Sequence, residues 1–421
     1  MASKPEIVVT GVGVISPIGI GKAPFWNALR EGQSGIRRLE LFEAPTQPPL
    51  IGGEVADFVP KQYVRPRKSL KIMSRNIQLA FAAADLAYVD AGLREKPIAP
   101  ERLGVVFGAN MIPCELDELI GAYHKCTIDG KFDFTHWGQA AMAELFPLWM
   151  LKYLPNMPAC HIGIGQDARG PNNTVTLGDV SSLSALTEAA RVLERGQADV
   201  MIAGGVGSRL NPMLWVRSHM MRISQRSDNP GAALRPFDAT RDGLVNGEGS
   251  GAFILESRRH AQARGAEAVA QVLGCARTFE PNRNGKPLRG DAIRRAIGAA
   301  LHDARRKPED VGVVVARGLG TLDDDRMEAQ AIHDAVGDVP VTAPKSYFGY
   351  LGAGDGSLET AAAILTLQHG QAPATLNYER PDPQCPINVV HGQPLPLDRP
   401  VALVLSHSQQ GQAVAVVLGG E

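Results

Sequence analysis

Short runs of β-branched and other apolar residues alternate along this chain with alanine-rich stretches of helical periodicity, and this alternation limits the fold class more than any other feature. The predicted strands are Ile7–Thr10, Leu103–Phe107, Val200–Ala203, Gly251–Leu255, Val311–Ala316 and Val401–Ser406. The predicted helices include Ile77–Ala91, Ser182–Arg195, Asp291–Arg305 and Ser357–Gln368. Continuous Val/Ile-rich strands are typical of sheets buried on both faces, so the pattern predicts an α/β fold with a parallel or mixed sheet.

The same local order occurs twice in the chain. A helix and an acidic turn precede both Leu103–Phe107 and Val311–Val315, at an offset of 208 residues. Helices that begin at Ser182 and Ser357 are offset by 175 residues. The difference predicts an insertion of about 33 residues within 111–170. We therefore predict two duplicated halves, residues 1–255 with this long insertion and residues 256–421.

Charge and composition exclude several classes of partner. Lys+Arg 43 against Asp+Glu 44 provides no whole-chain attraction to nucleic acid or anionic membrane, and 5% aromatic residues argue against a nucleic-acid stacking platform. No apolar run reaches the ~18 residues of a membrane span, and the N-terminus lacks the layout of a signal peptide. Five cysteines without C-x-x-C spacing indicate neither a zinc site nor a disulfide framework. We expect a cytoplasmic protein with no nucleic-acid partner and no membrane span.

Three local patterns have a structural explanation beside a functional one. Gly11-Val12-Gly13 lacks the third glycine of a dinucleotide loop, so a glycine turn for close backbone packing is favoured and no cofactor is predicted. Asp323-Asp324-Asp325 is predicted as a solvated or salt-bridged loop rather than a metal site. A basic stretch forms either a solvated face or a docking surface for an acidic partner. Its members are Arg65, Arg67, Lys68, Lys71 and Arg75.

Several longer motifs together resemble the β-ketoacyl-acyl-carrier-protein synthase family. They are Thr10–Pro17, Asn156–Pro158, Arg169–Asn172, Ala203–Gly205, Arg235–Asp238, Arg241–Gly243, Gly247–Gly249 and Lys345–Ser346, in the family's order over nearly the whole chain. The resemblance implies a thiolase-like five-layered α/β/α/β/α fold of two duplicated halves, which agrees with the internal duplication. It also implies a dimer, with the strand Asn173–Thr176 at its interface, that takes acyl chains from an acyl carrier protein. The basic stretch would then dock that carrier.

The resemblance also assigns the family's catalytic positions, and all three of its cysteine and histidine positions are substituted here. The nucleophilic cysteine's position is Asp179, the first histidine's is Arg317 and the second histidine's is Tyr350. The family's lysine and downstream glutamate match Lys345 and Glu359. The substrate-gating loop near the C-terminus also departs from the family pattern. It reads Ser408-Gln409-Gln410-Gly411-Gln412.

The substituted residues make ordinary condensation unfavourable. A carboxylate is a weak nucleophile toward a thioester, and its attack would give a mixed anhydride of higher energy than the thioester consumed. The expectation is a non-condensing partner similar to the chain-length factors, which help to shape an acyl tunnel beside an active ketosynthase. Asp325-Arg326-x-Glu328-Ala329 also looks like that subfamily, although chain-length factors usually carry glutamine where Asp179 stands.

Three alternatives remain open at this level. The first is a malonyl-carrier decarboxylase or other altered acyl-thioester enzyme, with Arg317 binding a carboxylate. The second is a 3-oxoacyl-carrier synthase-type acyltransferase with unrecognised chemistry, and the third is a homodimeric acyl-binding protein.

The resemblance implies that Asp179, Arg317 and Tyr350 surround one small buried site, and this location predicts a specific geometry. An isolated buried carboxylate or guanidinium costs several kcal/mol, whereas together they neutralise each other through charge-assisted hydrogen bonds. We predict contact between Asp179 and Arg317 within about 4 Å, with the Tyr350 hydroxyl donating to a remaining carboxylate lone pair. The competing arrangement has Asp179 capping a helix while Arg317 turns toward Glu359 or solvent.

Overall fold

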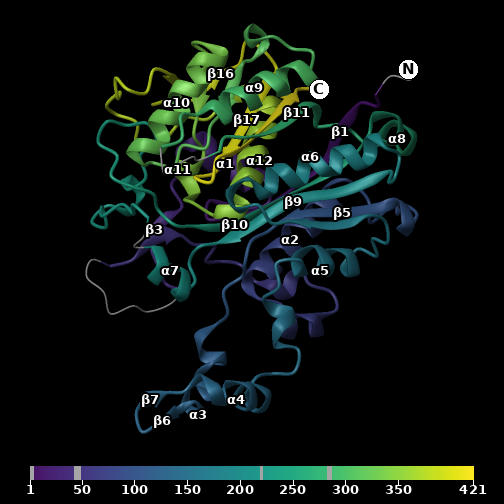
Figure 1. Ribbon diagram of the computed structural model, residues 1–421. Coiled ribbons are helices and arrows are strands. Elements are labelled where there is room, and N and C mark those ends of the chain that lie inside the picture. Colours follow the sequence, from purple (N-terminus) through teal and green to yellow (C-terminus); the bar gives the residue numbers. More distant parts are fainter. Residues whose placement is uncertain (1–3, 42–48, 219–220, 282–286) are drawn as a thin grey trace.

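The two halves of the chain build sheets with the same strand order. The computed structural model describes residues 4–41, 49–218, 221–281 and 287–421 (Figure 1). Residues 1–3, part of the segment in which we predicted no signal peptide, lie outside the described residues. In the first half the order is β8 (Asn172–Val175), β5 (Leu103–Gly108), β9 (Val200–Ser208), β10 (Glu248–Ser257) and β1 (Ile7–Ser16). In the second half it is β13 (Pro340–Thr342), β12 (Val313–Val315), β17 (Val401–His407), β18 (Gln412–Gly419) and β11 (Ala270–Phe279), with β15 (Asn388–Val389) at the edge.

The pairing directions repeat as well. In each half the first three strands run parallel to one another, and the two remaining strand pairings are antiparallel. The two sheets join where the start of β1 pairs with β11, Ile7 opposite Val272. The predicted boundary between residues 255 and 256 falls inside β10.

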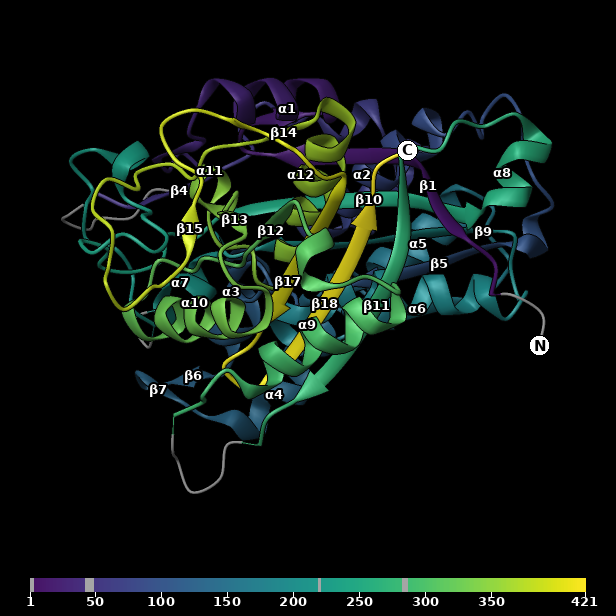
Figure 2. The same cartoon turned by 90° about the horizontal axis from the view of Figure 1, so that it is seen from above.

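Helices cover and separate the two sheets. α6 (Ser181–Glu194) and α12 (Asp355–His369) lie between the sheets, whereas α2 (Arg75–Asp90) and α5 (Met157–Gly165) cover the outer face of the first. α9 (Asp291–Asp303) and α10 (Leu322–Val336) lie over the outer side of the second (Figure 2). The predicted five-layered α/β/α/β/α fold is confirmed.

Shorter elements connect the layers. The connecting helices are α1 (Lys22–Glu31), α7 (Pro212–Ser218), α8 (Arg258–Arg264) and α11 (Lys345–Phe348). The remaining strands of the body are β2 (Gly19–Ile20), β3 (Ile36–Arg38), β4 (Ile51–Gly53), β14 (Gln371–Ala372) and β16 (Leu395–Pro396).

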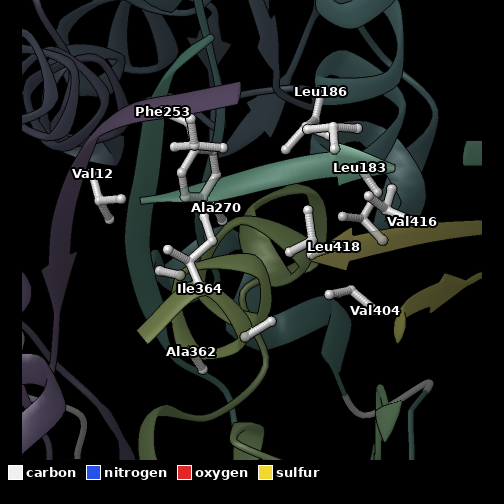
Figure 3. Close-up of a cluster of buried hydrophobic side chains, with 14 of the residues drawn as sticks. Val12, Leu183, Leu186, Phe253, Ala270, Ala362, Ile364, Val404, Val416 and Leu418 are labelled. Carbon is white, nitrogen blue, oxygen red and sulfur yellow. The ribbon is translucent and has the colours of Figure 1, made fainter. Parts of the chain in front are cut away.

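The largest core fills the space between the sheets, where apolar side chains from both halves meet. Figure 3 shows Leu183 and Leu186 of α6 beside Phe253 of the first sheet and Val416 of the second. Because both middle-layer helices are covered on two sides, α12 is buried along nearly its whole length. The N-terminal ends of these two helices are therefore held rigidly inside the molecule.

The predicted glycine turn after Thr10 is wrong, because β1 continues through Ser16. Its glycines instead allow α2 to lie directly against the strand. A Cβ added at Gly11 would lie 2.4 Å from the Ala87 carbonyl oxygen, and one at Gly13 would lie 2.0 Å from that of Ala83. The close packing that the sequence suggested is present, but in a strand rather than a turn.

Residues 111–154, within the predicted insertion, form an arm that projects from the body (Figure 1). The arm contains α3 (Ile120–Lys125), the β6–β7 hairpin (Thr127–Ile128 and Lys131–Phe132) and α4 (Trp137–Glu144). At its base the Tyr153 hydroxyl donates to the Glu118 carboxylate at 2.7 Å. Twelve of the twenty large hydrophobic side chains that are exposed in the described chain belong to the arm, including Phe134 at 70% and Met142 at 88%.

Among the helices of the described ranges, none is long and apolar enough to cross a membrane.

Candidate functional site

Asp179 stands at the buried end of the middle layer. It lies in the 3-10 turn Gly178–Val180, directly before α6. Gly178 has φ +59°, a left-handed conformation that glycine adopts without strain. The Ser406 hydroxyl of β17 donates to the Asp179 backbone carbonyl at 2.9 Å. The turn is thereby tied to the second sheet, and the carboxylate of Asp179 is directed to the junction of the two halves.

Arg317 comes from the loop after β12 and is 1% exposed. The backbone N–H groups of Arg317 and Gly318 donate to the Glu328 carboxylate of α10 at 2.7 and 2.9 Å. Glu328 is itself buried, so this loop is fixed from within the fold. The backbone position from which the Arg317 side chain extends is thereby fixed.

Tyr350 follows α11 and completes the group. Its backbone N–H donates to the Val245 carbonyl at 2.7 Å. Arg317 Nη2 donates to Asp179 Oδ2 at 2.7 Å, and the Tyr350 hydroxyl donates to Asp179 Oδ1 at 2.6 Å. The predicted contact is confirmed, and the helix-cap alternative is wrong because α6 has no side-chain cap hydrogen bond. We call these three side chains the plug.

The charges of the plug are mutually stabilised. Burial lowers the pKa of Arg317, but the Asp179 and Asp324 carboxylates outweigh it and hold that pKa above the ordinary arginine range. Burial, reinforced by Asp179, raises the pKa of Tyr350 well above its ordinary value. Both groups therefore remain protonated and act as donors.

Lys345 and Glu359, which the resemblance matched to the family's lysine and glutamate, lie in contact. Lys345 Nζ lies 2.8 Å from Glu359 Oε1 and 2.8 Å from Asp355 Oδ2, and all three residues are fully buried. Burial raises the pKa of Glu359 to about 8, although the Lys345 ammonium opposes the shift. Sequence reasoning missed Asp355, because Gly354-Asp355-Gly356 has the composition of a loop although α12 begins there.

A second arginine beside the plug was also missed. Arg209, immediately after β9, places its guanidinium carbon 5.5 Å from the centroid of the Tyr350 ring. The guanidinium of Arg317 lies 5.9 Å from the same ring. Nothing in the local sequence around Arg209 signals this position, because it depends on where β9 ends relative to Tyr350.

The predicted loop at Asp323–Asp325 is wrong, because these residues form the first turn of α10. Asp325 is fully buried and accepts hydrogen bonds from the backbone N–H groups of Phe237 and Gly320 at 2.8 and 3.0 Å. Arg241 lies 3.4 Å from its carboxylate. The salt-bridged alternative of that prediction is confirmed, because a buried arginine and the helix N-terminus together accommodate Asp325. No group of three or more potential ligands suited to a metal ion occurs in the described ranges.

A cavity of about 330 Å³ lies beside the plug. Leu244 and Leu319 line it and also pack against Tyr350. Gln409, from the predicted gating loop, lines it as well and donates to Asp324 Oδ2 at 3.4 Å. Gln410 is exposed, and Gly411 has φ +92° with no room for a side chain, since a Cβ would lie 1.9 Å from the Glu280 carbonyl oxygen.

Four members of the basic stretch lie together on the surface around the 3-10 helix Arg67–Ile72. Arg65, Arg67, Lys68 and Lys71 are exposed. Arg75 differs, because its Nε donates to the buried Glu248 carboxylate at 2.8 Å and its Nη2 donates to the Val55 carbonyl at 2.8 Å. We therefore leave Arg75 out of the exposed basic surface.

The chemistry open to this arrangement is narrow. Each carboxylate oxygen of Asp179 already accepts a strong hydrogen bond, so its nucleophilicity is low. Cysteine is absent from the residues that hydrogen-bond or pair with Asp179 in the described chain, and all five cysteines are free thiols elsewhere. The charged side chains of the plug therefore neutralise each other, and the site presents no reactive group.

Comparisons with known proteins extend over the whole chain. Residues 4–261 match the N-terminal domain of beta-ketoacyl synthases, and residues 269–379 match their C-terminal domain. The 3-oxoacyl-[acyl-carrier-protein] synthase 2 of Synechocystis sp. is 34% identical over 98% of this chain and 97% of its own length. The tetracenomycin polyketide synthase ketoacyl synthase alpha subunit of Streptomyces glaucescens is 35% identical over 92% of this chain and 91% of its own.

Solved structures agree with these relatives. The ishigamide ketosynthase/chain length factor superposes with a TM-score of 0.87 at 27% identity, over 100% of both chains. A ketosynthase solved in complex with its type II polyketide acyl-carrier protein superposes with a TM-score of 0.83 at 28% identity, also over 100% of both chains. With both domains matched in order and the layered fold in place, this chain belongs to the beta-ketoacyl synthase family.

Proposed function

We propose that this chain is a non-condensing ketosynthase-fold subunit of fatty acid or polyketide biosynthesis, which pairs with a triad-intact ketosynthase and helps to shape its acyl tunnel. The observation that carries the proposal is the plug. Asp179, Arg317 and Tyr350 occupy the positions that the family resemblance assigns to the cysteine and two histidines. Their side chains bind one another instead of leaving a group free for an acyl thioester.

The same contacts weigh against a malonyl-carrier decarboxylase. That activity would use Arg317 to bind the substrate carboxylate. The guanidinium already donates to Asp179 at 2.7 Å, and its Nη1 lies 4.0 Å from Asp324. A substrate carboxylate would have to displace an internal one that is held in place by covalent attachment, which gives the internal group a large advantage in effective concentration.

Two surfaces support a protein partner of the same fold. β8 is an edge strand of the first sheet, and its outer backbone groups are available for pairing with another strand. The twelve exposed hydrophobic side chains of the arm are 37% to 88% exposed and amount to roughly 1,000 Å², against about 800 Å² per partner in a standard protein interface. A ketosynthase-fold neighbour that covers both surfaces would make a stable dimer. The solved relative described as a ketosynthase/chain length factor supports this pairing.

An acyl carrier protein is the second proposed partner. Arg65, Arg67, Lys68 and Lys71 form an exposed basic surface suited to an acidic carrier. The relative solved with its carrier protein supports the assignment. We place the function in the cytoplasm, in keeping with five cysteines that form no disulfide.

The test is to incubate the purified chain alone with acyl- and malonyl-carrier protein and to follow acyl-enzyme and carbon dioxide by mass spectrometry. We expect neither product. Carbon dioxide release above the background of heat-denatured protein would favour the decarboxylase instead, and a stoichiometric acyl-enzyme would favour a condensing enzyme. A triple variant, with Arg67, Lys68 and Lys71 all changed to Glu, should weaken carrier binding at least tenfold at low salt, whereas replacing Arg294, Arg295 and Lys307 should not.

A further inference from the structure

The cavity beside the plug has a chemically uneven lining. One wall is apolar, from Leu244, Leu288, Leu319, Met221 and Met327. The least exposed polar residues of the lining are Thr321 and Asp324, and we call this part of the cavity its inner end, with the exposed Gln409 beside it. Leu244 and Leu319 also pack against Tyr350, and Asp324 lies 4.0 Å from Arg317, so the cavity adjoins the plug.

Asp324 is held as a fixed negative charge at that end. The Thr321 hydroxyl donates to its Oδ2 at 2.7 Å and the Gln409 amide donates to the same oxygen at 3.4 Å. Its side chain is only 15% exposed. Burial raises the pKa of Asp324, but Arg317 and the Thr321 hydrogen bond outweigh it and the pKa lies below the usual range.

The neighbouring charges leave the inner end negative. Arg317 lies 4.0 Å from Asp324, but its charge is shared with Asp179 at 2.7 Å. These three groups carry a formal charge of −1 together. Asp323 and Arg222 also line the cavity with opposite charges, but both are exposed, where water screens them more strongly than the buried groups.

We infer that Asp324 is a specificity-determining residue, through which this cavity admits thioester ligands with uncharged acyl ends and rejects those that end in a carboxylate. This inference rests on the proposed function, because it takes the ligand to be a carrier-linked acyl thioester. An acyl end with a hydroxyl or amide N–H can donate to Asp324, and an alkyl end packs on the leucine wall. At an effective dielectric constant of about 20, two like charges about 6 Å apart repel enough to weaken binding by about a hundredfold. Partial neutralisation by Arg317 reduces this, so we expect at least a tenfold preference.

The experiment measures binding of two hydrolysis-resistant probes, butyryl-pantetheine and malonyl-pantetheine with an amide in place of the thioester. The wild-type chain should bind the butyryl probe at least tenfold more tightly at low salt. Asp324→Asn should bring the two affinities within about threefold, because asparagine keeps an oxygen for Thr321 and Gln409 but carries no charge. The matched control is Asp334→Asn, an exposed aspartate of the same helix that accepts a hydrogen bond from the Gln330 amide at 2.8 Å and does not line the cavity. This variant should keep the wild-type preference.

Each other outcome overturns the inference. Equal wild-type affinities, or a preference that survives in Asp324→Asn, would remove the role of Asp324. If neither probe binds, the cavity is not a thioester site. The proposed function has a separate readout, since a chain that releases no carbon dioxide and pairs with a ketosynthase satisfies it whatever the cavity prefers.

Discussion

Removing the plug's carboxylate should expose how strongly the three plug residues depend on one another. In Asp179→Ala the guanidinium of Arg317, which is 1% exposed in the intact plug, loses its 2.7 Å partner. Breaking a buried ion pair from one side typically costs about 3–5 kcal/mol, because the remaining charge is left without compensation. Asp179 is 16% exposed and Asp324 remains 4.0 Å away, so we expect a loss near the lower end, about 3 kcal/mol.

The second variant tests the coupling. Arg317→Met in the Asp179→Ala background removes the orphaned charge and leaves a flexible apolar side chain of similar length in its place. The double variant should regain about 2 kcal/mol or more relative to Asp179→Ala alone. Tyr350→Phe, which deletes one donor to the carboxylate, should cost about 1.5–3 kcal/mol.

The assay is equilibrium urea unfolding of wild type, both single variants and the double variant, compared at unchanged slope. The control is the surface pair Asp291–Arg294, 2.9 Å apart with both side chains more than 40% exposed, where Asp291→Ala should leave the unfolding midpoint nearly unchanged. Single-variant costs that simply add in the double variant would refute the coupling, and so would a stable Asp179→Ala protein.

Three further outcomes follow from the same structure. Restoring the thiol alone, by Asp179→Cys, should give no condensation in a malonyl-carrier assay, because Arg317 and Tyr350 remain; family-like rates in this variant would contradict the proposed function. Glu359 binds its proton more tightly in the folded state, with a pKa of about 8 against 4.5 ordinarily. Protonation of Glu359 therefore stabilises the fold fully below about pH 4.5, and this stabilisation is lost as the pH rises toward 8. Glu359→Gln should reduce the change of melting temperature between pH 4.5 and 8, and a profile equal to that of wild type would contradict this role of Glu359. Phe134→Ser with Met142→Ser at the arm should weaken association with a second ketosynthase-fold chain at least tenfold in sedimentation, whereas Phe279→Ser, 56% exposed on β11, should not; equal effects would exclude the arm from the interface.

The layered fold was predictable because its evidence is local and periodic. Val200–Ala203 and Val401–Ser406 are continuous apolar runs, and the helices beginning near Ser182 and Ser357 repeat at matched positions, so the duplication could be found from the sequence. The short strand bounds were less predictable. β9 extends five residues beyond Ala203 through Gly204, Gly205 and Gly207, which a strand pattern disfavours but which the approach of neighbouring backbone requires.

The contact between Asp179 and Arg317 was predictable for a different reason. The family resemblance places both side chains at one buried site, where two such charges are tolerable only if they meet. Arg209, Asp355 and the helical state of Asp323–Asp325 were not predictable. Their roles depend on which backbone groups and charges from distant segments surround them: Phe237, Gly320 and Arg241 stabilise Asp325, and Lys345 stabilises Asp355.

The sequence by itself therefore determined the fold class and the repeated order of elements, and the family resemblance predicted which side chains stand at the catalytic positions. Only the tertiary structure decided that Arg75 is engaged by Glu248 rather than free on the surface, that Asp324 is the charge at the inner end of the cavity, and that the insertion projects as an apolar arm. Hydrophobic periodicity indicates which face of a helix or strand is buried. The ion pairs of a charged side chain, and whether that side chain is exposed, depend instead on residues that lie hundreds of positions away in the sequence, so no local pattern predicts them.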